Sequence, residues 1–210
     1  MSYLRIIPGL ALVLASELAG AGAYEDMLDA VKKDDVPAVN LLLKRGLDVN
    51  TTDREGNSLL VLAVKEGSSQ AVKALLAAHA QVDAHNALGE TALMLASLQG
   101  HLEVVRSLLV QGAQFNRPGW TPLIYAAVKG DVRISRLLLA YGAHVNAAAD
   151  NGFTALMMAA REGHTELISF LLANGADPNL KTDAGLTALA AAQSRGRKDI
   201  ADLLIRAGAQ

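Results

Sequence analysis

The sequence predicts an all-α repeat solenoid, built from six helix–turn–helix units that stack on one another and are joined by short β-hairpin fingers. Three features recur together: a ladder of glycines, a hydroxyl residue two places after each ladder glycine, and an apolar trio in the second helix of each unit. The ladder glycines stand 33, 30, 33 and 33 residues apart, at Gly56, Gly89, Gly119, Gly152 and Gly185. Two short helices of this size cannot bury their own apolar faces, so the units must stack.

The first helix of each unit is expected to begin at the hydroxyl residue that follows the ladder glycine. Serine and threonine favour this position because the side-chain oxygen accepts a hydrogen bond from the first helical turn. Pro122 follows one of these residues, at a place where the helix does not need a backbone N–H. The five hydroxyl residues are Ser58, Thr91, Thr121, Thr154 and Thr187.

In the second helix of each unit, Val or Ile is followed by Leu three and four residues later, as in Val72, Leu75 and Leu76. This spacing places the three side chains on one helical face. The same pattern at Val39 and Leu42 extends the array back to a first unit without the glycine signal. Each second helix is expected to end in a left-handed residue. The candidates are His79, Gly112, Gly142, Gly175 and Gly208.

These motifs resemble the ankyrin repeat. The stretch Gly119-Trp120-Thr121-Pro122-Leu123 and the pairs Ala126-Ala127 and Gly163-His164 match that family's pattern closely, and the resemblance covers about residues 24–210. The repeats are predicted at about 24–52, 53–85, 86–117, 118–148, 149–181 and 182–210.

The sequence departs from the family pattern at the histidine that usually follows Thr-Pro-Leu. The five equivalent positions are Val61, Met94, Ile124, Met157 and Ala190. An apolar residue there avoids burying a polar ring but loses its directional hydrogen bonds. We therefore expect these five side chains to lie in the core.

Residues 1–23 are predicted to form a signal peptide. Arg5 precedes an apolar run from Ile6 to Ala15, and small residues follow up to a cleavage site after Ala23, with Ala21 as the alternative. The run is too short to anchor the chain in a bilayer, so no membrane insertion is expected after signal removal. The expected location is periplasmic or secreted. The alternative is a capping helix that remains attached.

Composition and motifs argue against several classes of function. The 19 basic and 21 acidic residues give a net charge of −2 with no basic cluster, so no nucleic acid partner is expected. Without cysteine the chain has no disulfide and no cysteine zinc site. No nucleophile elbow, zinc-protease or phosphate-loop motif occurs. The sequence thus predicts no catalytic residue, no cofactor and no metal site, and so no enzyme.

The resemblance implies binding of a protein partner through the concave face that the fingers and first helices line. Aromatic residues make up only 4% of the chain, and they gather in the fourth and fifth repeats on positions expected to be exposed. Tryptophan and tyrosine are enriched at the centres of interfaces. The candidate partner-binding residues are Leu88, Leu95, Arg117, Trp120, Tyr125, Phe153, Met158, Arg161 and Leu186. The alternative is that Trp120 and Phe153 pack on neighbouring fingers and stiffen them.

The predicted function is therefore that of a monomeric, non-enzymatic binding module that docks or stabilises an unidentified protein in the periplasm. Two alternatives remain open. One is a secreted effector that binds a host protein, and the other is an accessory subunit that completes an enzyme's active site.

Overall fold

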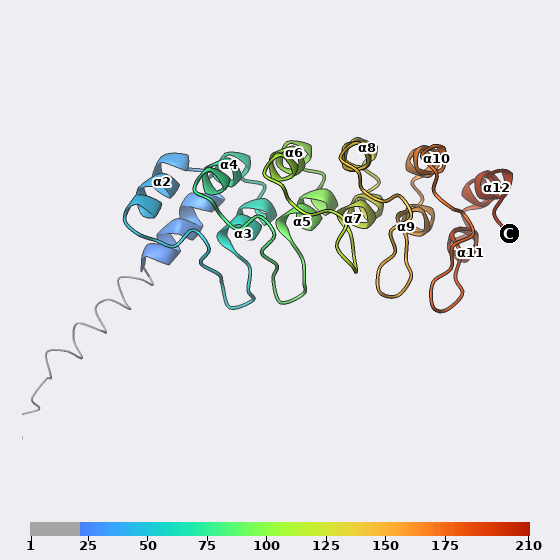
Figure 1. Cartoon of the computed structure of the whole chain (residues 1–210), viewed down its shortest axis with the longest axis horizontal. Coiled ribbons are helices and arrows are strands. Elements are labelled where there is room, and N and C mark those ends of the chain that lie inside the picture. The colour runs from blue at the N-terminus through green and yellow to red at the C-terminus, as the bar shows by residue number, and fades with distance from the viewer. Residues whose placement is uncertain (1–21) are drawn as a thin grey trace, which may run out of the picture. The chain divides into compact units, whose positions relative to one another are not determined.

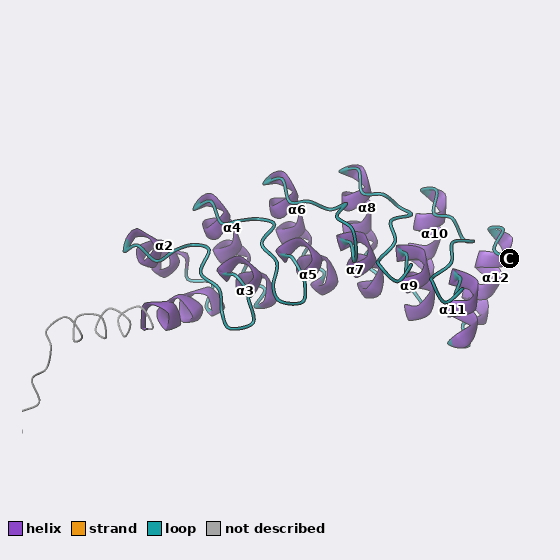
Figure 2. Ribbon diagram, turned by 60° about the horizontal axis from the view of Figure 1, so that its bottom comes forward, coloured by secondary structure: helices purple, strands orange, loops and turns teal. Residues whose placement is uncertain are grey.

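The computed structural model describes residues 22–210, and this part of the chain is built from helices and loops (Figure 2). The predicted signal peptide, residues 1–23, lies outside the described residues except for Gly22 and Ala23. These two belong to a helical segment over residues 22–32. The chain divides into two compact units, with the boundary between Gln81 and Val82.

The N-terminal unit contains the helical segment 22–32 and three further helices. They are α2 (Val36–Lys44), α3 (Leu59–Lys65) and α4 (Ser69–Ala77). The carboxylate of Asp34 accepts hydrogen bonds from the backbone N–H groups of Gln70 and Ala71, at 3.3 and 2.7 Å. The side chain of Ser68, which precedes α4, makes no capping bond itself. A carboxylate from the preceding repeat therefore caps α4.

The C-terminal unit contains four helix pairs arranged in two layers (Figure 1). The first helices pack side by side in chain order, and each contacts its own second helix. They are α5 (Ala92–Gln99), α7 (Pro122–Lys129), α9 (Ala155–Glu162) and α11 (Ala188–Ser194). The second helices are α6 (Leu102–Val110), α8 (Val132–Ala140), α10 (Thr165–Ala173) and α12 (Lys198–Arg206).

The predicted helix starts and ends are confirmed. Each hydroxyl residue accepts a hydrogen bond from the backbone N–H three residues later, at 3.2 to 3.4 Å. After the second helices, Gly112, Gly142, Gly175 and Gly208 adopt φ values between 83 and 97°. His79 holds the same left-handed place with φ 62°. These signals were predictable because each depends on residues only three or four places apart.

The apolar residues that replace the family histidine are buried in four of the five repeats. Val61, Met94, Ile124 and Met157 are each at most 6% exposed, as predicted. The prediction is wrong for Ala190, which is only half-buried. Ala190 lies in α11, which packs against the first helix α9 of the preceding repeat and against its own second helix α12.

The fingers are hairpins closed by single antiparallel bridges rather than by extended strands. Bridges join Thr52 to Ser58, His85 to Thr91 and Ala148 to Thr154. Among residues 22–210 no bridge closes the finger before α7 or the finger before α11. The finger before α7 is also shorter than the loops before α5, α9 and α11 (Figure 1). Three residues are missing from the finger before α7, and its Pro118 has no N–H to donate across a hairpin.

A ladder of side-chain amides, which we call the asparagine ladder, ties the helix-exit loops of successive repeats together. Asn116 donates from Nδ2 to the carbonyl of Gly142 at 3.0 Å and accepts at Oδ1 from the N–H of His144 at 3.0 Å. The same pair of bonds recurs in the next two repeats. Asn146 bonds to Gly175 and Asp177, and Asn179 bonds to Gly208 and Gln210.

Asp83 occupies the equivalent place one repeat earlier. Its Oδ1 accepts a hydrogen bond from the N–H of Gln114 at 2.9 Å. A carboxylate has no donor, however, so it cannot make the second bond, which would end on the carbonyl of Gly112. Asp83 is thus the position in the C-terminal unit where half of the interaction is missing.

Replacing Asp83 with asparagine is expected to raise the free energy of unfolding by about 0.5 to 1.5 kcal/mol, because it supplies the missing donor. The reverse change, Asn116→Asp, should lower it by a similar amount. Urea unfolding followed by circular dichroism measures both values. Asp202→Asn removes the same charge from an exposed position of α12 and should change stability little. Equal shifts for Asp83→Asn and Asp202→Asn would show that charge, rather than the hydrogen bond, is responsible.

Candidate functional site

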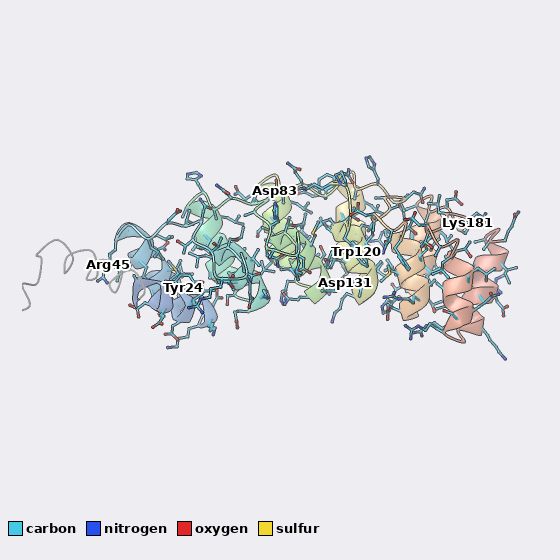
Figure 3. The ribbon with its side chains drawn as sticks, turned by 90° about the horizontal axis from the view of Figure 1, so that it is seen from below. Tyr24, Arg45, Asp83, Trp120, Asp131 and Lys181 are labelled. Atoms are coloured by element: carbon cyan, nitrogen blue, oxygen red, sulfur yellow. The ribbon has the colours of Figure 1, made fainter. Side chains whose placement is uncertain are left out.

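The candidate site is the surface of the fingers and first helices in the C-terminal unit. All nine predicted residues belong to these fingers and helices, and seven of them are at least partly exposed. Leu88, at a finger tip, is 82% exposed. The side chains that are partly exposed are Arg117, Trp120, Tyr125, Phe153, Arg161 and Leu186. Trp120 precedes α7 and Asp131 follows it, so they lie at opposite ends of this helix (Figure 3).

The expectation that Leu95 and Met158 are exposed is wrong. Leu95 is 7% exposed and Met158 is 1% exposed. Both stand four residues after a capping threonine, on first helices that pack directly against the first helices of neighbouring repeats. The side chains of Leu95 and Met158 are therefore covered by this packing. Both residues belong to the core and cannot meet a partner without unfolding.

Trp120, Tyr125 and Glu90 form the first cluster of the site, which we call the Trp120 cluster. The rings of Trp120 and Tyr125 meet edge to face, with centroids 5.7 Å apart and planes at 64°. The hydroxyl of Tyr125 donates to Oε1 of Glu90 at 3.1 Å. Glu90 follows its ladder glycine directly, as Trp120 does one repeat later. This shared place in the repeat was the signal that could have added Glu90 to the candidates.

Phe153 and Arg161 form a second cluster in the next repeat. The guanidinium of Arg161 lies over the ring of Phe153, 5.8 Å from its centroid, and its Nε donates to Glu162 at 2.9 Å. The guanidinium of Arg161 thus interacts both with an aromatic ring and with a carboxylate of its own helix. Phe153 is therefore a less open anchor than the sequence predicts, because one part of its ring is already covered.

A histidine and an arginine at the start of second helices link these repeats further. Nε2 of His164 lies 3.0 Å from the carbonyl oxygen of Val128, and Nε of Arg197 donates to the carbonyl of Arg161 at 3.0 Å. A side chain on Gly130 would meet the ring of His164 at 2.5 Å, so the close approach requires glycine. These bonds tie the C-terminal ends of α7 and α9 to the start of the second helix in the following repeat.

Residues 22–210 contain neither a candidate metal site nor a candidate membrane-spanning helix. This part of the chain holds no group of three or more His, Asp or Glu side chains placed to bind a metal ion. Nor does any of its helices have the length and apolar character needed to cross a membrane.

Tyr125 is expected to titrate late, because burial, the charge of Glu90 and the hydrogen bond to Glu90 raise its pKa from 10.0 to about 12. Since the pKa in the folded protein lies above the ordinary value, the stability linked to Tyr125 is fully present below pH 10. It is lost as the pH rises toward about 12. Tyrosinate absorbance should show a late transition among the four tyrosines, and Tyr125→Phe should remove it. Glu90→Gln should lower its pKa, and an unchanged transition in that variant would contradict the assigned contact.

Comparisons with known proteins agree with the fold. A family model described as ankyrin repeats (3 copies) matches residues 27–118, 60–149, 111–182 and 148–210. The solved structures include a similar one, the crystal structure of an ankyrin repeat domain from Acinetobacter baumannii AYE. It is 33% identical, has a TM-score of 0.76, and the match covers 88% of this chain and 98% of that one. A search of curated proteins found no match. The chain belongs to the ankyrin repeat family.

Proposed function

We propose that this protein is a non-enzymatic binding module that docks one protein partner on the fingers and first helices of its C-terminal unit. Ankyrin repeats serve generally as protein interaction modules, which supports the class of function. One observation carries the choice of surface. The only tryptophan of the chain, Trp120, stands on a finger and remains partly exposed, although it could have been placed in the core.

Preorganisation supplies the mechanism of this docking. The fingers are held by backbone hydrogen bonds such as Asn86 N–H to Glu90 O at 3.0 Å and Ala149 N–H to Phe153 O at 2.9 Å. The asparagine ladder fixes the loops from which they emerge. A partner therefore meets side chains that lose little conformational entropy on binding, and a few aromatic anchors can provide much of the affinity.

The proposal includes export to the periplasm, supported by the charge, apolar run and small residues of segment 1–23. Fractionation and mass determination of the mature chain test this part. We expect a processed protein that begins at Tyr24 and stays in the periplasm. Release into the medium would instead support the secreted effector, and an unprocessed cytoplasmic chain would contradict export.

The docking surface is tested by affinity capture from a native extract with the mature protein and the double variant Trp120→Ala/Phe153→Ala. We expect the double variant to lose the captured partner, because truncating a central aromatic anchor commonly costs 2 kcal/mol or more, about thirtyfold in affinity. Its thermal unfolding should stay close to that of the parent. The matched control is Val110→Ala/Tyr141→Ala, which removes two exposed apolar side chains at the ends of second helices.

Two outcomes would contradict the proposal. If the double variant unfolds much more easily but still captures the partner, the aromatic residues stiffen the fingers and do not bind. If the control variant loses the partner and the finger variant keeps it, the second-helix layer is the docking surface. Catalytic activity of the purified protein alone would overturn the assignment as a non-enzyme.

A further inference from the structure

We propose that the Trp120 cluster receives a lysine or arginine side chain of the docked protein. This inference rests on the proposed function, because the cation is carried by the partner. It goes further by assigning the chemistry of the central contact. Three observations support it: the type of ring, the absence of an internal cation over that ring, and uncompensated carboxylates beside it.

The first observation concerns the ring. Among aromatic side chains, the indole of tryptophan attracts cations most strongly, at up to about 6 Å from the ring centroid. Trp120 touches Tyr125 edge to face and remains partly exposed to solvent. The cluster thus offers two rings set at an angle of 64° to each other, fixed by the hydrogen bond from Tyr125 to Glu90.

The second observation is that the chain places its own cations over other rings. Arg136 lies 4.7 Å from the centroid of Phe170, and Arg161 lies 5.8 Å from that of Phe153. Within residues 22–210 no Lys or Arg stacks on Trp120. Two weaker cation-binding rings are therefore occupied from within the molecule, and the strongest one is left for an external group.

The third observation is the charge around Trp120. Oε1 of Glu90 accepts from the hydroxyl of Tyr125, and Oε2 accepts from Nδ2 of Asn86 at 3.0 Å. Both donors are neutral, so they orient the carboxylate without compensating its charge. On the next finger, Oδ2 of Asp150 would lie 3.4 Å from a Cβ added to Gly119, the residue that precedes Trp120.

No cation of the described chain neutralises these two carboxylates. The ion pairs within residues 22–210 involve neither Glu90 nor Asp150. Arg117 is only three residues from Trp120 in sequence, yet it forms no ion pair with either of them. The Trp120 cluster thus contains one carboxylate without an ion-pair partner, and a second such carboxylate lies close to Gly119, on the same finger as Trp120. This charge disfavours an acidic anchor and favours a cationic one.

A lysine or arginine side chain matches both parts of the cluster. Its apolar stem can lie along the rings while its charged end reaches Glu90, where a charge-assisted hydrogen bond replaces contacts with water. A leucine or phenylalanine of a partner would cover the rings but would also desolvate the carboxylate of Glu90 without supplying a cation to neutralise it.

The only tryptophan of the chain reports directly on this site. Its fluorescence can be titrated in the full-length protein with the N-acetyl methylamides of arginine and lysine, and with those of leucine and glutamine as neutral controls. We expect a saturable emission change with the two cationic compounds, half-complete at about millimolar concentration, and none with the neutral ones. Glu90→Gln should weaken binding roughly five- to tenfold, because the carboxylate is lost while the rings remain.

Glu103→Gln is the matched control, since Glu103 is an exposed carboxylate at the start of α6, in the other helix layer. It should leave the titration unchanged. Asp150→Asn, a change on an exposed finger, provides a second variant in case Glu90→Gln alters the fold, and it should weaken binding less than Glu90→Gln does. Thermal unfolding of each variant shows whether its structure is retained.

The inference is wrong if the leucine compound binds as well as the cationic ones, if no titration saturates, or if folded Glu90→Gln binds as the parent does. Such a result leaves the proposed function separately testable. Partner capture that is lost in Trp120→Ala/Phe153→Ala but kept in Glu90→Gln would indicate an apolar anchor on the same surface. Capture unaffected by either change would reject the surface itself.

Discussion

The asparagine ladder is the interaction on which the regular spacing of the repeats depends. Each second helix ends in a left-handed residue, after which the chain turns away with backbone groups that no helix can satisfy. Asn116, Asn146 and Asn179 satisfy one carbonyl and one N–H of the next exit loop with a single side chain. Because the fingers begin directly at these residues, the ladder also determines where the finger side chains stand.

The short finger before α7 shows how strongly this constraint acts. Asn116 and Gly142 are 26 residues apart, whereas Asn146 and Gly175 are 29 apart, and both pairs make the same hydrogen bond. The loss of three residues is therefore absorbed by the finger, and not by the helices or the ladder. Trp120 directly follows the tip of this shortened finger, and its ring packs on Tyr125 of α7.

The repeat, the helix caps and the left-handed ends could be predicted because each is set by a few neighbouring residues. Exposure on the first helices could not, because it depends on how each side chain packs against the first helices of neighbouring repeats. Tyr125 and Met158 occupy the same place in the repeat, yet one is partly exposed and the other is buried. The contribution of Glu90 to the site could not be predicted for a related reason. It depends on a hydrogen bond from the hydroxyl of Tyr125, which lies 35 residues later in the sequence.

The contrast between the two aromatic clusters explains how a fold with so little intrinsic specificity can still select a partner. Where Arg161 covers Phe153 and bonds to Glu162, the chain has satisfied its own charges, and a partner gains little by replacing those contacts. In the Trp120 cluster, the carboxylate of Glu90 is oriented by Tyr125 and Asn86 but is not paired with a cation. Because the scaffold is already ordered, an unsatisfied group of this kind favours a complementary partner and penalises the others.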